Sequence, residues 1–159
     1  MASRRRTIVD AIVTKLNTIT VANGYVNELG PTGAQPWRTR SNARSTLPIA
    51  LVVGGEEDKS INSATYYECQ LDVAIRTSVE GGAEGTDLWA KIDDLTADVE
   101  KALLASNAQD PPLLVTGVVD IVLLGHEARA EIETGVDPGA LIGCRVRYRH
   151  SISDPSVFP

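Results

Sequence analysis

The sequence contains little cysteine, few aromatic residues and no long apolar run. Cys69 and Cys144 form no CxxC pair and no metal-ligand cluster, and each falls at an inward-facing strand position. We therefore expect two buried reduced thiols, or a disulfide if their strands are neighbours. Aromatic residues make up 4% of the chain, so the core must consist mainly of Val, Ile, Leu and Ala. Because the sequence has no membrane-length apolar segment and no secretory signal, we expect folding in a cytoplasm and no membrane partner.

A basic surplus is also absent. The net charge is −6 at pH 7 and the pI is about 4.9, whereas proteins that bind DNA usually carry excess positive charge. Any basic feature is therefore local and lies in an acidic background. The length of 159 residues and the apolar content of 43% are those of an ordinary globular domain with one core.

Catalytic and cofactor motifs are missing as well. His126-Glu127 begins like a zinc-protease motif, but position 130 is alanine instead of the second histidine. The segment "GGAEGTD" lacks the Gly-Lys-Ser/Thr ending of a P-loop, and no serine lies in a G-x-S-x-G elbow. An enzyme would need His126 and His150 to converge with a carboxylate. We expect no enzyme, cofactor, metal or small-molecule substrate, which leaves binding or assembly.

The first periodic segment, residues 4–19, predicts an amphipathic helix. Its apolar stripe is formed by Ile8, Ile12, Leu16 and Ile19. Ser3 is the expected N-cap. Arginines in a first turn oppose the helix dipole, so Arg4, Arg5 and Arg6 are either frayed and solvated or bound to acidic groups of a partner.

The next segments predict turns and a buried strand. Residues 20–47 are rich in Gly, Pro and Asn and indicate one or two short strands, with Trp37 anchored in the core. "LPIALVVGG" is expected to be a buried strand that ends at its two glycines. A polar loop then spans residues 55–63, and its Glu56, Glu57 and Asp58 are expected to be solvated.

Residues 64–79 alternate apolar and polar side chains and predict a long antiparallel strand with one packed face. A second helix should follow, capped by Thr86 and stopped by "QDPP". Its stripe comprises Leu88, Ile92, Leu95, Val99 and Leu103, which Trp89 and Leu104 extend.

Three more strand candidates follow: "GVVDIVLLG", "EARAEIE" and "GALIGCRVRYRHSI", with a turn at "GVDPG". The order helix, strands, helix, strands predicts an α+β fold in which two amphipathic helices pack on one face of a mainly antiparallel sheet. The long 64–79 strand could project as a hairpin. We expect one domain over residues 1–159, with a core of about 4–151 and a loose tail at 152–159.

Arginine occupies every second position of the last strand, at Arg145, Arg147 and Arg149, so the three guanidinium groups should share one face. We call these residues the arginine stripe. A nucleic-acid contact is one interpretation. The acidic background favours carboxylate partners instead, within the sheet or across a subunit boundary, because guanidinium binds carboxylate in a bidentate way. The candidate partners are Glu68, Asp72 and Glu131.

Several segments together resemble the tail terminator, or tail completion, proteins of long-tailed bacteriophages. They are "RRRTIVDAIVTKLNTI", "LPIALVVGGEEDKS", "ECQLDVAIRTSVEG", "LWAKIDDLTADVEKALLA" and "GHEARAEIETGVDPGALIGCRVRYRHSISDP". The resemblance implies a virion subunit that forms a homohexameric ring at the head-proximal end of the tail. Such a ring caps the tail tube, stops its polymerisation and offers a surface to the head connector, while DNA passes through the lumen without sequence-specific recognition.

In that reading the expected subunit-interface residues are acidic or basic side chains on strands and at the N-terminus: Arg145, Arg147, Arg149, Glu68, Asp72, Glu131, Arg4, Arg5 and Arg6. Two alternatives remain. One is a neighbouring neck or head–tail connector protein. The other, of a different class, is a nucleic-acid-binding protein that uses the arginine stripe together with Arg4 to Arg6.

Overall fold

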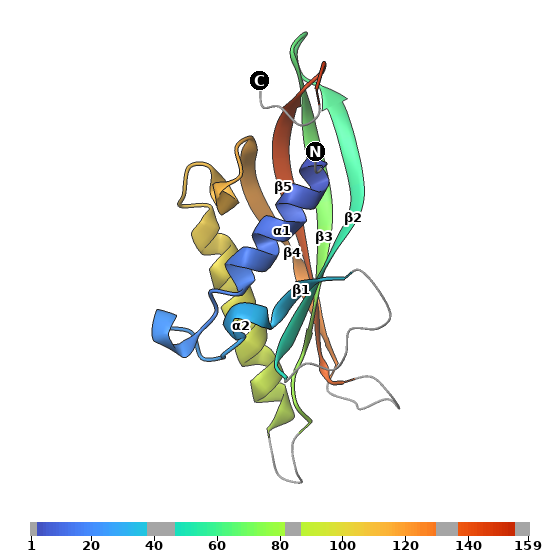
Figure 1. The fold of residues 1–159 in the computed structure, drawn as a ribbon. Coiled ribbons are helices and arrows are strands. Elements are labelled where there is room, and N and C mark those ends of the chain that lie inside the picture. The colour runs from blue at the N-terminus through green and yellow to red at the C-terminus, as the bar shows by residue number, and fades with distance from the viewer. Residues whose placement is uncertain (1–2, 38–46, 82–86, 130–136, 155–159) are drawn as a thin grey trace.

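A computed structural model describes residues 3–37, 47–81, 87–129 and 137–154. These form a five-stranded sheet in the order β1-β2-β3-β5-β4. Its strands are β1 (Ala34–Pro36), β2 (Ile49–Ile61), β3 (Tyr66–Ser78), β4 (Val118–Arg129) and β5 (Gly139–Ser151). Only the β1–β2 pair is parallel. Helices α1 (Arg4–Leu16) and α2 (Leu88–Ser106) cover one face, as Figure 1 shows. The predicted α+β fold is confirmed. We call the uncovered side the open face.

Helix α1 begins and packs as its sequence predicts. The Ser3 side chain accepts a hydrogen bond from the backbone N–H of Arg6, which satisfies one free donor of the first turn. The helix ends at Leu16, so Ile19 lies beyond it, yet all four stripe residues are fully buried. Burial of each Ile or Leu side chain contributes roughly 1.5–3 kcal/mol, which fixes α1 against the sheet.

Helix α2 differs from the prediction at its cap and at two apolar residues. The cap is Asp87, which accepts from the N–H of Ala90, while Thr86 lies outside the described residues. Trp89 and Leu104 were expected to extend the stripe, but they are 54% and 50% exposed. At about 100° per residue, Leu104 is rotated roughly 140° from the buried Val99, so it faces solvent. The rest of the stripe packs inward, and Leu88 is partly buried.

Glycines that were expected to end strands instead mark bulges. Strand β2 continues through Gly54 and Gly55 to Ile61, with a register shift against β3 between Gly54 and Glu57. The expected polar loop over residues 55–63 is therefore wrong. Likewise, β4 contains "VVDIVLLG" and residues 127–129 of "EARAEIE" in one strand, because Gly125 adopts φ = +129° at a second register shift and the strand continues; residues 130–133 lie outside the described residues.

The long alternating strand is confirmed as β3, whose odd-numbered residues from Cys69 to Thr77 are buried under the helices. Strands β2 and β3 form a hairpin whose tip reaches beyond the N-terminal end of α1 (Figure 1). Ile61 near that tip is 68% exposed. The sheet therefore extends past its helical cover.

Trp37 is not the core anchor that the sequence suggested. Its backbone N–H donates to the carbonyl of Val52 just after the short strand β1, but its side chain is 45% exposed. The guanidinium of Arg76 lies 5.9 Å from the indole centroid. Because β1 is an edge strand, the indole covers the rim of the sheet and does not enter the layer under the helices.

Both cysteines are buried and unpaired, as expected for reduced thiols. Their strands are neighbours, yet Cys69 lies opposite Tyr148, four residues along β5 from Cys144. That offset is roughly 13 Å along a strand, too far for a disulfide. Burial raises the pKa of the Cys144 thiol to about 12, so it stays protonated at neutral pH.

Candidate interaction surface

The arginine stripe lies on the open face, on a strand flanked by two others. Strand β5 pairs with β3 on one side and with β4 on the other, so Arg145 and Arg147 have a neighbour on each strand, while Arg149 is paired with β3. Odd-numbered residues of β5 point to the open face, while Cys144, Val146 and Tyr148 are buried under the helices. The register therefore decides which carboxylates each arginine meets.

Arg145 forms a bidentate pair with Asp72, its direct cross-strand neighbour on β3. The guanidinium donates from Nε to Oδ1 at 2.6 Å and from Nη2 to Oδ2 at 3.0 Å. Both side chains are more than one third exposed. The hydrogen bonds from Arg145 hold the pKa of the Asp72 carboxyl below its usual value of 3.8, so the pair is charged at neutral pH.

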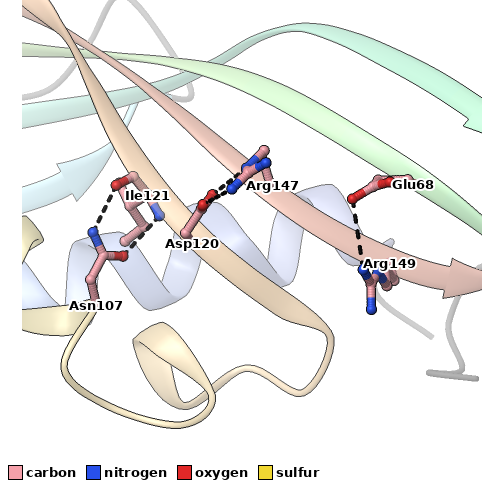
Figure 2. Close-up of polar contacts among 6 residues, drawn as sticks. All are labelled: Glu68, Asn107, Asp120, Ile121, Arg147 and Arg149. Atoms are coloured by element: carbon pink, nitrogen blue, oxygen red, sulfur yellow. Dashed lines mark hydrogen bonds and ion pairs between the residues drawn. The ribbon is translucent and has the colours of Figure 1, made fainter.

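Arg147 takes its partner from the other side. Its neighbour on β3 is the uncharged Gln70, whereas its neighbour on β4 is Asp120. Arg147 forms a second bidentate pair with Asp120, in which Nε of the arginine donates to Oδ1 of the aspartate at 2.6 Å (Figure 2). Its hydrogen bonds lower the pKa of the Asp120 carboxyl. The neighbouring Ile121 exchanges two backbone hydrogen bonds with the Asn107 side chain at the end of α2, which ties β4 to that helix. The sequence interpretation did not include Asp120 among the partners.

Arg149 has the loosest partner of the three. Its Nη2 lies 3.9 Å from Oε1 of Glu68, the cross-strand neighbour on β3 (Figure 2). The guanidinium carbon also lies 5.2 Å from the ring centroid of Tyr66, within cation–π range. Its Nε is buried without a hydrogen-bond partner. All three stripe arginines thus have a carboxylate neighbour inside the chain.

The other predicted interface residues fall into two groups. Glu131 lies outside the described residues. Arg4 begins α1 in helical conformation, and Arg5 donates from Nη2 to the carbonyl of Gly54 on β2, so the frayed interpretation is wrong for Arg5. Arg6 lies 3.7 Å from Asp10, one turn along the helix, with both side chains about half exposed.

Glu57 is a polar residue whose position the sequence did not reveal. It was expected in a solvated loop, but the bulge in β2 turns it under the helices, where it accepts a hydrogen bond of 2.5 Å from the Tyr148 hydroxyl. The Nζ atom of Lys59 lies 3.1 Å from Oε1 of Glu57. Burial alone would raise the pKa of Glu57, but the bonds from Tyr148 and Lys59 and the nearby charge of Arg5 lower it overall. Burial and the bond to Glu57 raise the pKa of Tyr148.

The two histidines do not converge. His126 lies opposite Ile142 on β5, which places it roughly 26 Å along the strand from His150. The Nδ1 atom of His126 lies 3.1 Å from Glu100, while His150 is buried against Tyr67 and Tyr148. Within the four described ranges, no group of three potential metal ligands occurs, and no helix is long and apolar enough to cross a membrane.

Beside the arginine stripe, the open face carries exposed apolar side chains. Leu141 on β5 is 49% exposed, and Val122 and Leu124 on β4 are 44% and 53% exposed. Val122 lies opposite Arg145, and Glu127 lies opposite Leu141, so the apolar side chains adjoin the ion pairs directly. Leu141 itself lies between Arg76 on β3 and Glu127 on β4, so the exposed apolar side chains of the open face are interspersed with charged ones. No protein-family model matches the sequence, and a search of curated proteins finds no significant match.

Proposed function

We propose that the protein is a structural ring subunit, the tail terminator of a long-tailed bacteriophage. Six copies would form a ring at the head-proximal end of the tail tube, stop tube polymerisation and present a surface to the head connector. The proposal unites the resemblance of the sequence to tail terminators with a surface suited to assembly.

The observation that carries this proposal is the open face. A sheet face that no helix of the described residues covers, and that exposes Val122, Leu124 and Leu141, is typical of a surface that another protein covers. Burying an unpaired arginine under a partner protein is costly. Because the stripe arginines already have carboxylate neighbours within the chain, covering this face would not incur that cost. An assembly subunit needs a surface of this kind.

The nucleic-acid alternative gains less support. Arg145 and Arg147 each donate two hydrogen bonds to a carboxylate, and a phosphate would have to displace those bonds. Retention on a DNA column should therefore be weak at low salt and should not change in Arg147→Ala. A retention that falls steeply with salt and is lost in Arg145→Glu would favour the nucleic-acid function instead.

The experiment that tests the terminator function adds purified protein to a growing polymer of its tail-tube protein. Elongation should stop, and the protein should be found at one end of each tube by electron microscopy. Lys15→Glu, the same kind of charge change on α1 away from the open face, provides a control that should still stop growth. Continued elongation at saturating protein would contradict the assignment.

A further inference from the structure

A cavity of about 370 Å³ lies between the first turn of α1 and the adjoining edge of the sheet. We call it the N-terminal pocket. Its volume is at the lower end of the range of about 300–1,000 Å³ that ligand pockets occupy. Its lining includes Arg5, Arg6, Val9, Asp10, Pro36 and Trp37. Arg6 lies 3.7 Å from Asp10, so the pocket combines an arginine that has a carboxylate neighbour, Arg5 and apolar side chains.

The bulge in β2 builds one wall of this pocket. A Cβ atom on Gly54 would lie 3.1 Å from Nε of Arg5 and 3.2 Å from Cγ2 of Val9, so the missing side chain leaves room for the guanidinium. Arg5 uses one donor on the carbonyl of Gly54. Since a guanidinium has five donors, Arg5 is fixed in place and still has donors for a ligand.

The exposed aromatic ring indicates a protein partner. Trp37 lines the pocket and is 45% exposed, with the Arg76 guanidinium 5.9 Å from its indole centroid. Tryptophan and arginine are the residues most often found at interface hot spots. The ligand chemistry that matches this pocket is a carboxylate next to an aromatic side chain. The carboxylate would pair with a guanidinium, and the aromatic side chain would pack on Trp37 or against an arginine.

One surface of the chain offers that combination. Trp89 is 54% exposed at the start of α2, and Asp93 lies one turn later on the same side of the helix and is exposed. Within the described part of the chain, no hydrogen bond or ion pair engages the Asp93 side chain. Helix α1 packs on β1 and β2, whereas α2 packs on β4 and β5, so the two surfaces lie toward opposite edges of the sheet.

We propose that the N-terminal pocket binds Trp89 and Asp93 of a second copy of this chain. Because the two surfaces differ and lie toward opposite edges, the contact is heterologous and can repeat from copy to copy until a ring closes. This inference rests on the proposed ring function and names the contact that builds it. It also gives a role to the basic first turn of α1, which opposes the helix dipole.

Chemical crosslinking tests the contact directly. A chain with Arg6→Cys and Asp93→Cys, treated with a short bis-maleimide, should give a ladder of covalently linked dimers, trimers and larger oligomers, because each copy carries both halves of the contact. Cys69 and Cys144 are fully buried and should not react. Each single variant should give dimers at most. Absence of a ladder from the double variant would overturn the inference.

A charge reversal separates this inference from the proposed function. Arg6→Glu and Asp93→Lys should each weaken self-association about tenfold, and the two changes in one chain should restore it, because the attraction returns with opposite sign. Trp37→Ala should weaken association by about thirtyfold, as for a hot-spot tryptophan. Arg129→Glu makes the same charge change as Arg6→Glu and should have no effect.

Each outcome has one meaning. A sixfold mass that none of the pocket variants changes would keep the ring and reject this contact. A chain that stays monomeric, both free and with tail tubes, would reject the ring itself. Single-stranded DNA binding that Trp37→Ala abolishes, with no change in mass, would assign the pocket to nucleic acid and overturn the inference.

Discussion

The molecule has two sets of three arginines, and their surroundings differ. The arginine stripe on β5 meets carboxylates on both neighbouring strands, so its charge is neutralised inside the chain. Arg4, Arg5 and Arg6 follow one another on a helix and point in directions about 100° apart, so one row of carboxylates on a neighbouring strand cannot form ion pairs with all three. Arg5 binds a backbone carbonyl, Arg6 lies 3.7 Å from Asp10 on the same helix, and both arginines line a pocket. Hence the partners around an arginine cluster, more than its size, indicate its availability for binding.

The largest expected effect concerns the Tyr148 hydroxyl, which lies on the covered side of the strand that bears the stripe. Tyr148→Phe leaves the half-buried Glu57 carboxylate without its hydrogen bond. We expect a loss of about 1–3 kcal/mol in the free energy of unfolding, measured by urea denaturation. Tyr25→Phe is a suitable control, and an equal loss there would show that the bond to Glu57 has no special weight.

The next effect measures how firmly the stripe is paired. Asp120→Ala should cost about 1 kcal/mol, because a half-exposed bidentate pair is near the upper end of what surface pairs contribute. Arg147→Ala and the double variant complete a thermodynamic cycle. A coupling energy of zero would mean that the arginine is free for other partners, which would remove the distinction between the two arginine sets.

Acid should weaken the stripe selectively. Asp72 and Asp120 have pKa values below 3.8, their usual value, so their pairs stabilise the fold fully above that pH. This stabilisation is lost as the pH falls through the lower pKa values of the folded state. Unfolding measured between pH 5 and about 2 should show a shallower loss in the Asp72→Asn, Asp120→Asn double variant. An identical pH dependence would contradict the pairing.

The smallest effect combines two opposing contributions. Arg6→Glu places a negative charge in the first turn, which suits the helix dipole, but it also replaces the pair with Asp10 by a like-charge contact. We therefore expect the free energy of unfolding of the isolated chain to change by less than about 0.5 kcal/mol. Thermal unfolding of the monomer at low salt measures this change. A much larger loss of stability would show that Arg6 supports the fold, and the case for an interaction role of the first turn would fail.

The sequence predicted the layers well, because apolar periodicity reports which face of an element is buried. It also predicted two stripe partners: Glu68 and Asp72 are four residues apart, as are Arg149 and Arg145, so one antiparallel register satisfies both pairs. The pairing of Arg147 with Asp120 required knowledge that β4 flanks β5, which depends on sheet order and not on local pattern.

The errors share a physical cause. Gly54, Gly55 and Gly125 were interpreted as strand ends, but a glycine accommodates a bulge as readily as a turn, and only the pairing strand decides between them. Because the bulge in β2 was not recognised, Glu57 was assigned to a solvated loop. Trp37 and Trp89 were assigned to the core from size and spacing alone, although both lie at ends of elements where the layer above the sheet stops.

The most direct test of the central claim, a ring-forming subunit, is the mass of the assembled protein. Size-exclusion chromatography with light scattering should give six times the chain mass of 17.0 kDa, either for the free protein or for the species released from capped tail tubes. A mass of one chain under both conditions, at every concentration, would contradict the account.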